Sequence, residues 1–109
     1  MKTLLVSGQA FGRGDDALGT IVTEKFFTLL ADEPALPETI FFYNTGVRLC
    51  LEGSPVLPYL KALRGRGVNL LACSTCLDYY KAKPVPEVEA STMKRLLSLM
   101  AAEPGIVAV

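Results

Sequence analysis

The fold class is decided by residues 68–80, which read VNLLACSTCLDYY. The run from Val68 to Cys73 is almost continuously apolar and lacks the alternation of a half-exposed strand, a pattern that is typical of a strand buried on both faces. A short helix is expected from Thr75 to Tyr80, directly after that strand. A buried strand that leads straight into a helix is the building unit of a parallel α/β sheet.

The same unit recurs on both sides of this stretch. Short apolar or β-branched runs predict four more strands, at Leu4–Val6, Thr39–Tyr43, Val85–Val88 and Ile106–Val109. Helical spacing predicts longer helices that begin after Asp15 or Asp16, at Ser54 and at Ser91. Because strands and helices alternate, we predict an α/β fold with three α/β/α layers around a mostly parallel five-stranded sheet, the flavodoxin-like architecture, in a single domain over residues 1–109.

Two of these helices carry long apolar stripes, which we expect to be the faces that pack on the sheet. The first stripe consists of Leu18, Ile21, Val22, Phe26, Leu29 and Leu30. The second consists of Met93, Leu96, Leu97 and Met100. Between them, Ser54 followed by Pro55 is typical of a helix N-cap and its first helical position, and Gly65 and Gly67 indicate where that helix ends.

The composition excludes several classes of function. Eleven basic and eleven acidic residues cancel, so the chain lacks the positive charge of a nucleic-acid or anionic-membrane binder. It contains no histidine, which excludes Cys-His nucleophilic pairs and mixed Cys/His zinc sites. The apolar stretch from Leu4 to Val6 is too short for a signal peptide or a membrane span, so we expect a cytoplasmic protein. We expect neither a metal nor a cofactor.

The three cysteines are the chemically informative residues. Cys50 stands between two leucines and is expected to be buried. Cys73 ends the predicted strand and Cys76 falls in the first turn of the helix, where free backbone N–H groups and the helix dipole favour a thiolate. A thiolate at this position can carry a persulfide or exchange disulfides. The alternative is that both cysteines are small core residues.

Ligands of parallel sheets bind at the carboxyl ends of the strands, where three loops are expected to meet. The first contains Gly12, Gly14 and Asp15, which could bind an anion or simply cap the next helix. The second contains Asn44 and Gly46, which are typical of a turn with positive φ. The third contains the cysteine pair. The candidate binding residues are therefore Gly12, Gly14, Asp15, Asn44, Gly46 and Thr75, with Tyr79 and Tyr80 expected at the rim or in the core.

Four blocks in this order resemble one family. They read GRGDD at 12–16, FYNTGV at 42–47, EGS at 52–54 and CSTCLDYY at 73–80. The chain is similar, from about residue 4 to residue 100, to the DsrE-like domain found at the C-terminus of YedF, a group of sulfurtransferase-like selenium metabolism proteins. Residues 88–93 depart from it, since they read VEASTM where the family usually has GEVTNM.

The resemblance implies a carrier that holds sulfur, or selenium, as a cysteine persulfide and relays it between partner proteins. By position, the sulfur-carrying cysteine of the related TusD proteins falls at Cys73, whereas Cys76 belongs to the YedF pattern. The family's N-terminal TusA-like domain, with its Cys-Pro-x-Pro motif, is not in this sequence, so separate donor and acceptor proteins are implied, TusA-like proteins among them. Proteins of this kind commonly form homo- or hetero-oligomers, and we expect this chain to form a homo-oligomer.

Two other functions use the same residues differently. A thiol-disulfide redox module would employ Cys73 and Cys76 without a cargo atom. A non-catalytic assembly domain would bury both cysteines and act through its interface.

Overall fold

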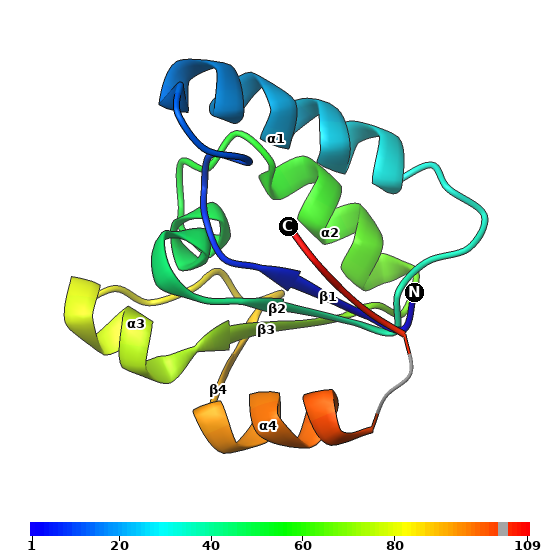
Figure 1. The fold of residues 1–109 in the computed structure, drawn as a ribbon, viewed down its shortest axis with the longest axis vertical. Helices are drawn as coiled ribbons and strands as arrows, with labels where there is room; N and C mark the ends of the chain where they lie inside the picture. Colours follow the sequence, from blue (N-terminus) through cyan, green and yellow to red (C-terminus); the bar gives the residue numbers. More distant parts are fainter. Residues whose placement is uncertain (103–104) are drawn as a thin grey trace.

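The computed structural model describes residues 1–102 and 105–109 of the chain. At its centre lies a five-stranded sheet in the order β4-β3-β2-β1-β5, in which every pairing is parallel (Figure 1). The strands are β1 (Thr3–Val6), β2 (Thr39–Phe42), β3 (Asn69–Cys73), β4 (Glu89–Ser91) and β5 (Ile106–Ala108). The predicted α/β fold with a parallel five-stranded sheet is confirmed.

The three central strands form the core. All residues of β1 and β2, and the last four of β3, are buried, because helices or loops cover both faces of the sheet. The register pairs Val6 with Phe42 and Phe42 with Ala72, so these strands end at the same edge. The loops that follow β2 and β3 are therefore neighbours in space.

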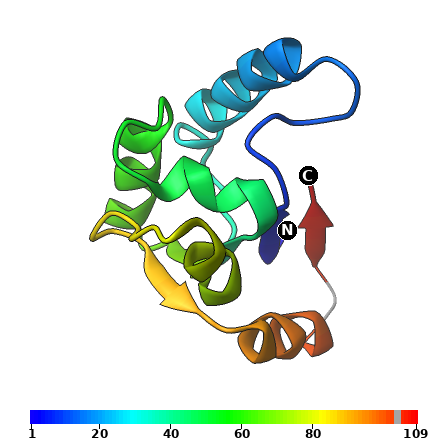
Figure 2. The ribbon, with the colours of Figure 1, turned by 90° about the vertical axis from the view of Figure 1, so that its left-hand side faces the viewer.

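The helices form two layers. Helices α1 (Asp16–Leu30) and α2 (Leu57–Gly65) cover one face of the sheet, and α4 (Met93–Ala101) covers the other (Figure 1). Helix α3 (Ser74–Tyr80) continues directly from β3, and the 3-10 helix η1 (Asn44–Cys50) follows β2. Helices η1 and α3 lie side by side at the carboxyl edge of the sheet (Figure 2).

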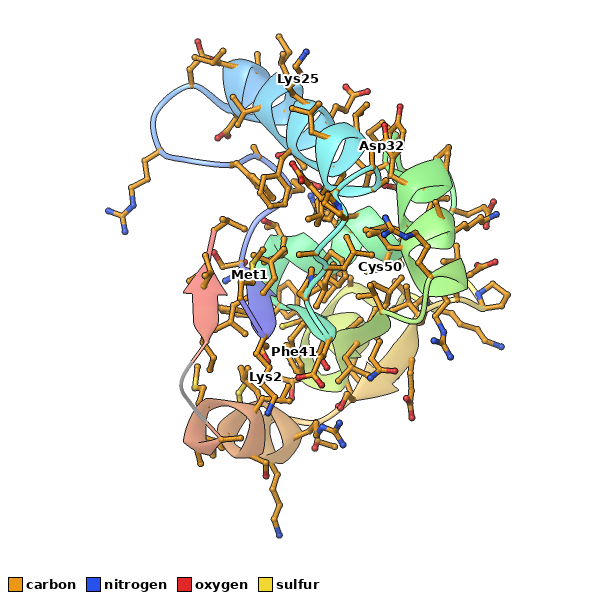
Figure 3. The ribbon with its side chains drawn as sticks, turned by 90° about the vertical axis from the view of Figure 1, so that its right-hand side faces the viewer. Met1, Lys2, Lys25, Asp32, Phe41 and Cys50 are labelled. Atoms are coloured by element: carbon orange, nitrogen blue, oxygen red, sulfur yellow. The ribbon has the colours of Figure 1, made fainter. Side chains whose placement is uncertain are left out.

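The predicted buried face of α1 is right only for Leu30, which is buried, and Phe26, which packs against the core. Leu18, Ile21 and Leu29 are each more than half exposed, at 56%, 64% and 54%, and Lys25 also lies on this outer side (Figure 3). The buried residues of the helix are Gly19, Thr23, Phe27 and Leu30. The preceding loop selects this face.

Two contacts explain that selection. A side chain at Gly19 would approach the carbonyl oxygen of Phe11 to 2.8 Å, so only glycine lets the loop lie against the helix. The Thr23 hydroxyl donates to the carbonyl oxygen of Gln9 at 3.1 Å and accepts from the N–H of Phe11 at 3.1 Å. Through these bonds the buried polar side chain of Thr23 holds α1 against the loop. The pattern of apolar residues cannot predict such a contact.

The strand predicted at Val85–Val88 is also wrong. This segment is a turn in which the Val88 N–H donates to the carbonyl oxygen of Val85, and β4 begins only at Glu89. Pro84 and Pro86 carry no N–H and cannot contribute to a strand ladder. Both valines are still buried.

Two predicted helix starts shift along the chain. Helix α2 begins at Leu57, and the Ser54 hydroxyl accepts from the Val56 N–H in the turn before it. Ser91 is the last residue of β4, and the N-cap of α4 is Thr92, whose hydroxyl accepts from the Arg95 N–H.

The apolar stripe of α4 is only partly a core face. Leu96 is buried, whereas Met93, Leu97 and Met100 are exposed. In the part of the chain that is described, every helix is too short or too polar to cross a membrane. The interior of the molecule holds Phe41 and Cys50, both fully buried (Figure 3).

Candidate functional site

The site is built where β2 and β3 end beside each other. Strand β2 ends at Phe42, and the chain passes through Tyr43 into Asn44, the first residue of η1. Strand β3 ends at Cys73, and the next helix places Cys76 in its first turn. The parallel register brings Asn44 and Cys76 into contact although they are 32 residues apart in the sequence.

The contact is a hydrogen bond to sulfur. The backbone N–H of Asn44 donates to the Sγ atom of Cys76, with 3.1 Å between nitrogen and sulfur. Asn44 has a φ of 53°, in the left-handed region that asparagine tolerates better than most residues. Its side-chain Oδ1 accepts from the N–H of Thr45 at 2.7 Å. The turn with positive φ predicted here is confirmed at Asn44.

Gly46 has a different role from the one predicted. Its φ is not positive, and a Cβ atom at this position would overlap the carbonyl oxygen of Val6. The glycine is required because the loop after β2 lies against the end of β1. In addition, the Thr45 hydroxyl oxygen accepts from the N–H of Gln9 at 3.2 Å, which ties the two loops together.

A pocket of about 430 Å³ opens beside the thiol of Cys76. Its lining consists of Asn44, Thr75, Cys76, Tyr79 and Tyr80. Of the candidate binding residues, Asn44 and Thr75 therefore belong to the site.

The two tyrosines form an aromatic wall of the pocket. Their rings meet edge to face, with centroids 5.2 Å apart. The guanidinium carbon of Arg48 lies 4.4 Å from the centre of the Tyr80 ring, within the range of a cation–π contact. Tyr79 is 80% exposed at the rim. The spacing of the tyrosines, one helical turn after Cys76, could have identified them as lining residues, whereas no sequence signal points to Arg48.

The two cysteines of the pair differ in access. Cys73 is fully buried, whereas Cys76 is partly exposed and lines the pocket. Their thiols still interact with each other. A reagent that enters the pocket therefore meets Cys76 first.

Burial raises the pKa of the Cys76 thiol above the ordinary thiol value, and the neighbouring Cys73 thiol raises it further. The hydrogen bond from the Asn44 N–H acts in the opposite direction and lowers the pKa. The helix start alone predicts a lowered pKa, and this prediction is wrong because desolvation has the larger effect.

Gly12, Gly14 and Asp15 do not line the pocket. Asp15 caps α1, because its carboxylate accepts from the Leu18 N–H at 3.0 Å. Gly12 and Gly14 are exposed turn residues with φ values of +84° and +111°. Of the two roles considered for this loop, anion binding and helix capping, the geometry supports capping.

The remaining cysteine is structural. Cys50 is buried as predicted, and burial raises the pKa of its thiol. Its carbonyl oxygen accepts from the Val85 N–H at 2.9 Å, which holds the turn before β4. Within residues 1–102 and 105–109, no three Cys, Asp or Glu side chains gather in the way that metal ligands do.

Comparison with known proteins supports the fold and goes no further. No family model matches the chain, and no curated protein matches its sequence. The structure resembles the crystal structure of the ychN protein from E. coli, with a TM-score of 0.71 and 17% identity over 100% of both chains. It also resembles MTH1491 from Methanobacterium thermoautotrophicum, a protein of unknown function, with a TM-score of 0.70 and 16% identity over 98% of this chain and 96% of that chain. The chain thus shares its α/β fold with both proteins, while the resemblance to DsrE-like proteins and the closer relationship to YedF stay predictions.

Proposed function

We propose that the chain is a cytoplasmic sulfur carrier that holds a persulfide on Cys76 and passes it from a donor protein to an acceptor protein. The observation that carries the proposal is the environment of this thiol. Its sulfur accepts a backbone N–H and borders a pocket with room for a second sulfur atom and for part of a partner. The position of Cys73 in related proteins suggests it as the loaded residue, but its complete burial favours Cys76.

The chemistry needs one nucleophilic sulfur and two partners. The thiolate of Cys76 attacks the terminal sulfur of a donor persulfide, the donor S–S bond breaks, and the donor leaves as a thiolate. In the second step an acceptor thiolate attacks the terminal sulfur held on Cys76, and Cys76 leaves as a thiolate. Selenium in place of the terminal sulfur would follow the same bond changes.

Cys73 gives this carrier a second outcome. Its thiolate can attack the inner sulfur of the Cys76 persulfide, which forms a Cys73–Cys76 disulfide and releases hydrosulfide. The two thiols supply the two electrons that reduce the terminal sulfur. Cys73 would then act as a resolving residue that clears a carrier whose acceptor is missing.

Intact-mass measurement after incubation with a cysteine desulfurase and cysteine tests the proposal. We expect the wild-type protein to gain the mass of one sulfur atom, Cys76→Ser to gain none, and Cys73→Ser to retain the adduct longer than wild type. Cys50→Ser is the matched control and should load normally. Loading of Cys76→Ser but not of Cys73→Ser would reverse the roles, and loading of neither wild type nor any variant would exclude a carrier.

The contact between the two thiols supports the thiol-disulfide module as a second candidate. The same samples distinguish it from the carrier. A redox module would lose two protons and two electrons to an added mild oxidant, and would form the Cys73–Cys76 disulfide without ever gaining sulfur.

We also propose that the chain forms homo-oligomers. The outer side of α1 exposes Leu18, Ile21 and Leu29, and a second copy of the chain could cover these apolar side chains. Light scattering on the purified protein should report a dimer or a larger species. A monomer at high concentration would contradict this.

A further inference from the structure

The Asn44 N–H has no role in the secondary structure. The last ladder bond after β2 is made by the Tyr43 N–H, which donates to the carbonyl oxygen of Val6 at 3.0 Å. Asn44 begins η1, and the first N–H groups of a helix have no partner within it. The Asn44 N–H instead donates to the sulfur of Cys76.

The backbone on both sides of Asn44 is fixed, so the direction of the N–H is fixed too. Before it, Tyr43 is bound to the end of β1. After it, the Gly46 N–H donates to the carbonyl oxygen of Tyr43 at 3.0 Å, and Gly46 itself is held against Val6. The left-handed φ of 53° joins these two anchored segments. This conformation is unfavourable for most residues with a side chain and less so for asparagine.

The asparagine side chain strengthens the same geometry. Its Oδ1 accepts from the Thr45 N–H at 2.7 Å, so the next orphan donor of η1 is also satisfied. Glycine could adopt the same φ but would not supply this bond. The sequence therefore has the residue that is both tolerant of the left-handed region and able to stabilise it.

The other groups around Cys76 do little to stabilise its thiolate form. From β3 the Cys73 thiol faces it, and from α3 the pocket is lined by the rings of Tyr79 and Tyr80. From η1 the Arg48 guanidinium is held over the Tyr80 ring. Asn44 is thus the contact that favours the charged form of this sulfur.

We propose that Asn44 is a positioning residue whose left-handed backbone aims its N–H at the sulfur of Cys76 and so sets the reactivity of that thiol. This inference deepens the proposed function, because it concerns the thiol on which that function rests. It does not depend on the cargo, since it concerns the unloaded thiol.

The test measures the rate at which iodoacetamide modifies Cys76 in the unloaded protein as a function of pH, mapped by peptide. Asn44→Val disfavours the left-handed region and should turn the donor away. We expect the midpoint of its pH profile to move upward and its rate at neutral pH to fall about tenfold, as for the loss of a hydrogen bond to a charged group. Asn44→Gly keeps the conformation available and should restore the rate to within about threefold of wild type.

Lys81→Val is the matched control. Lys81 is the other non-glycine residue with positive φ in the described chain, at 51°, and it caps the C-terminus of α3, where its N–H donates to the carbonyl oxygens of Asp78 and Leu77. The Lys81→Val variant should have similar backbone strain, but the pH profile of Cys76 modification should be unchanged. If Asn44→Val does not fold, Asn44→Ala takes its place, with a smaller shift in the same direction.

Two results would overturn the proposal. One is a pH midpoint in Asn44→Val equal to that of wild type, and the other is an equal upward shift in Lys81→Val. Neither result bears on sulfur loading, which the intact-mass experiment tests separately. A protein that never accepts sulfur could still show the shift, and a working carrier could lack it.

Discussion

Two loops follow strands at the carboxyl edge of the sheet, and the sequence predicts both as candidate binding loops. Only one of them reaches the thiol of Cys76. The loop after β1, residues 7–15, ends as the cap of α1. The loop after β2, residues 43–46, donates to Cys76. The strand order explains the difference, because β2 is the neighbour of β3 whereas β1 is one strand further away. A loop at the correct edge therefore contributes to a site only if its strand also has the correct neighbour.

The two loops should also differ in what their glycines tolerate. Gly46→Ala should destabilise the protein by about 3 kcal/mol, since the new methyl group would overlap the backbone of Val6, which cannot move without disrupting β1. Gly12→Ala meets no atom within 4 Å and should cost only about 1 kcal/mol, from its φ of +84°. Urea denaturation measures both.

A control for this comparison lies in α2. Gly65 is helical, and an added Cβ meets no atom within 4 Å, so Gly65→Ala should leave stability unchanged or raise it by about 0.5 kcal/mol. Equal stability of the Gly46 and Gly12 variants would mean that the loop after β2 is not held against β1.

Local chain properties predicted most of the fold. The apolar runs of β1, β2 and β3 have no other good interpretation, because strands buried on both faces need them. The face of α1 could not be predicted in this way. Ile21 and Phe27 are both large and apolar, but Ile21 is exposed and Phe27 is buried. The choice between them depends on the fit of Gly19 against Phe11, which is a tertiary contact.

The candidate site was predictable in part. The position of Cys76 at a helix start follows from residues 68–80 alone, and so does its proximity to Cys73. Its bond to Asn44 depends on which strands are neighbours, which one sequence does not specify. The pKa of Cys76 depends on burial by the rest of the fold, so a local argument from the helix dipole gave the wrong direction.

The capping loop should affect stability without affecting the thiol. Asp15→Ala removes the acceptor of the Leu18 N–H and should cost about 1 kcal/mol, a usual value for an N-cap. The alkylation profile of Cys76 should be the same as in wild type, because this loop does not line the pocket. A slower reaction at Cys76 in this variant would show that the two loops act together on the thiol.

A substitution at Thr45 is the most sensitive test of whether the β1 loop influences the thiol of Cys76, because Thr45 joins the two loops by a hydrogen bond. Thr45→Val keeps the shape of the side chain and keeps the backbone N–H that donates to Asn44, but it removes the hydroxyl oxygen that accepts from Gln9. The Gln9 N–H then has only water as an acceptor. At this half-buried position we expect the free energy of unfolding to fall by about 0.5–1 kcal/mol, as measured by urea denaturation. If the β2 loop is positioned by Val6 and not by the β1 loop, Cys76 should be alkylated at a rate within about twofold of wild type, since the Asn44 N–H stays in place. A larger change in rate, together with the small loss of stability, would mean that the first loop reaches the thiol indirectly and that strand order alone does not separate the two.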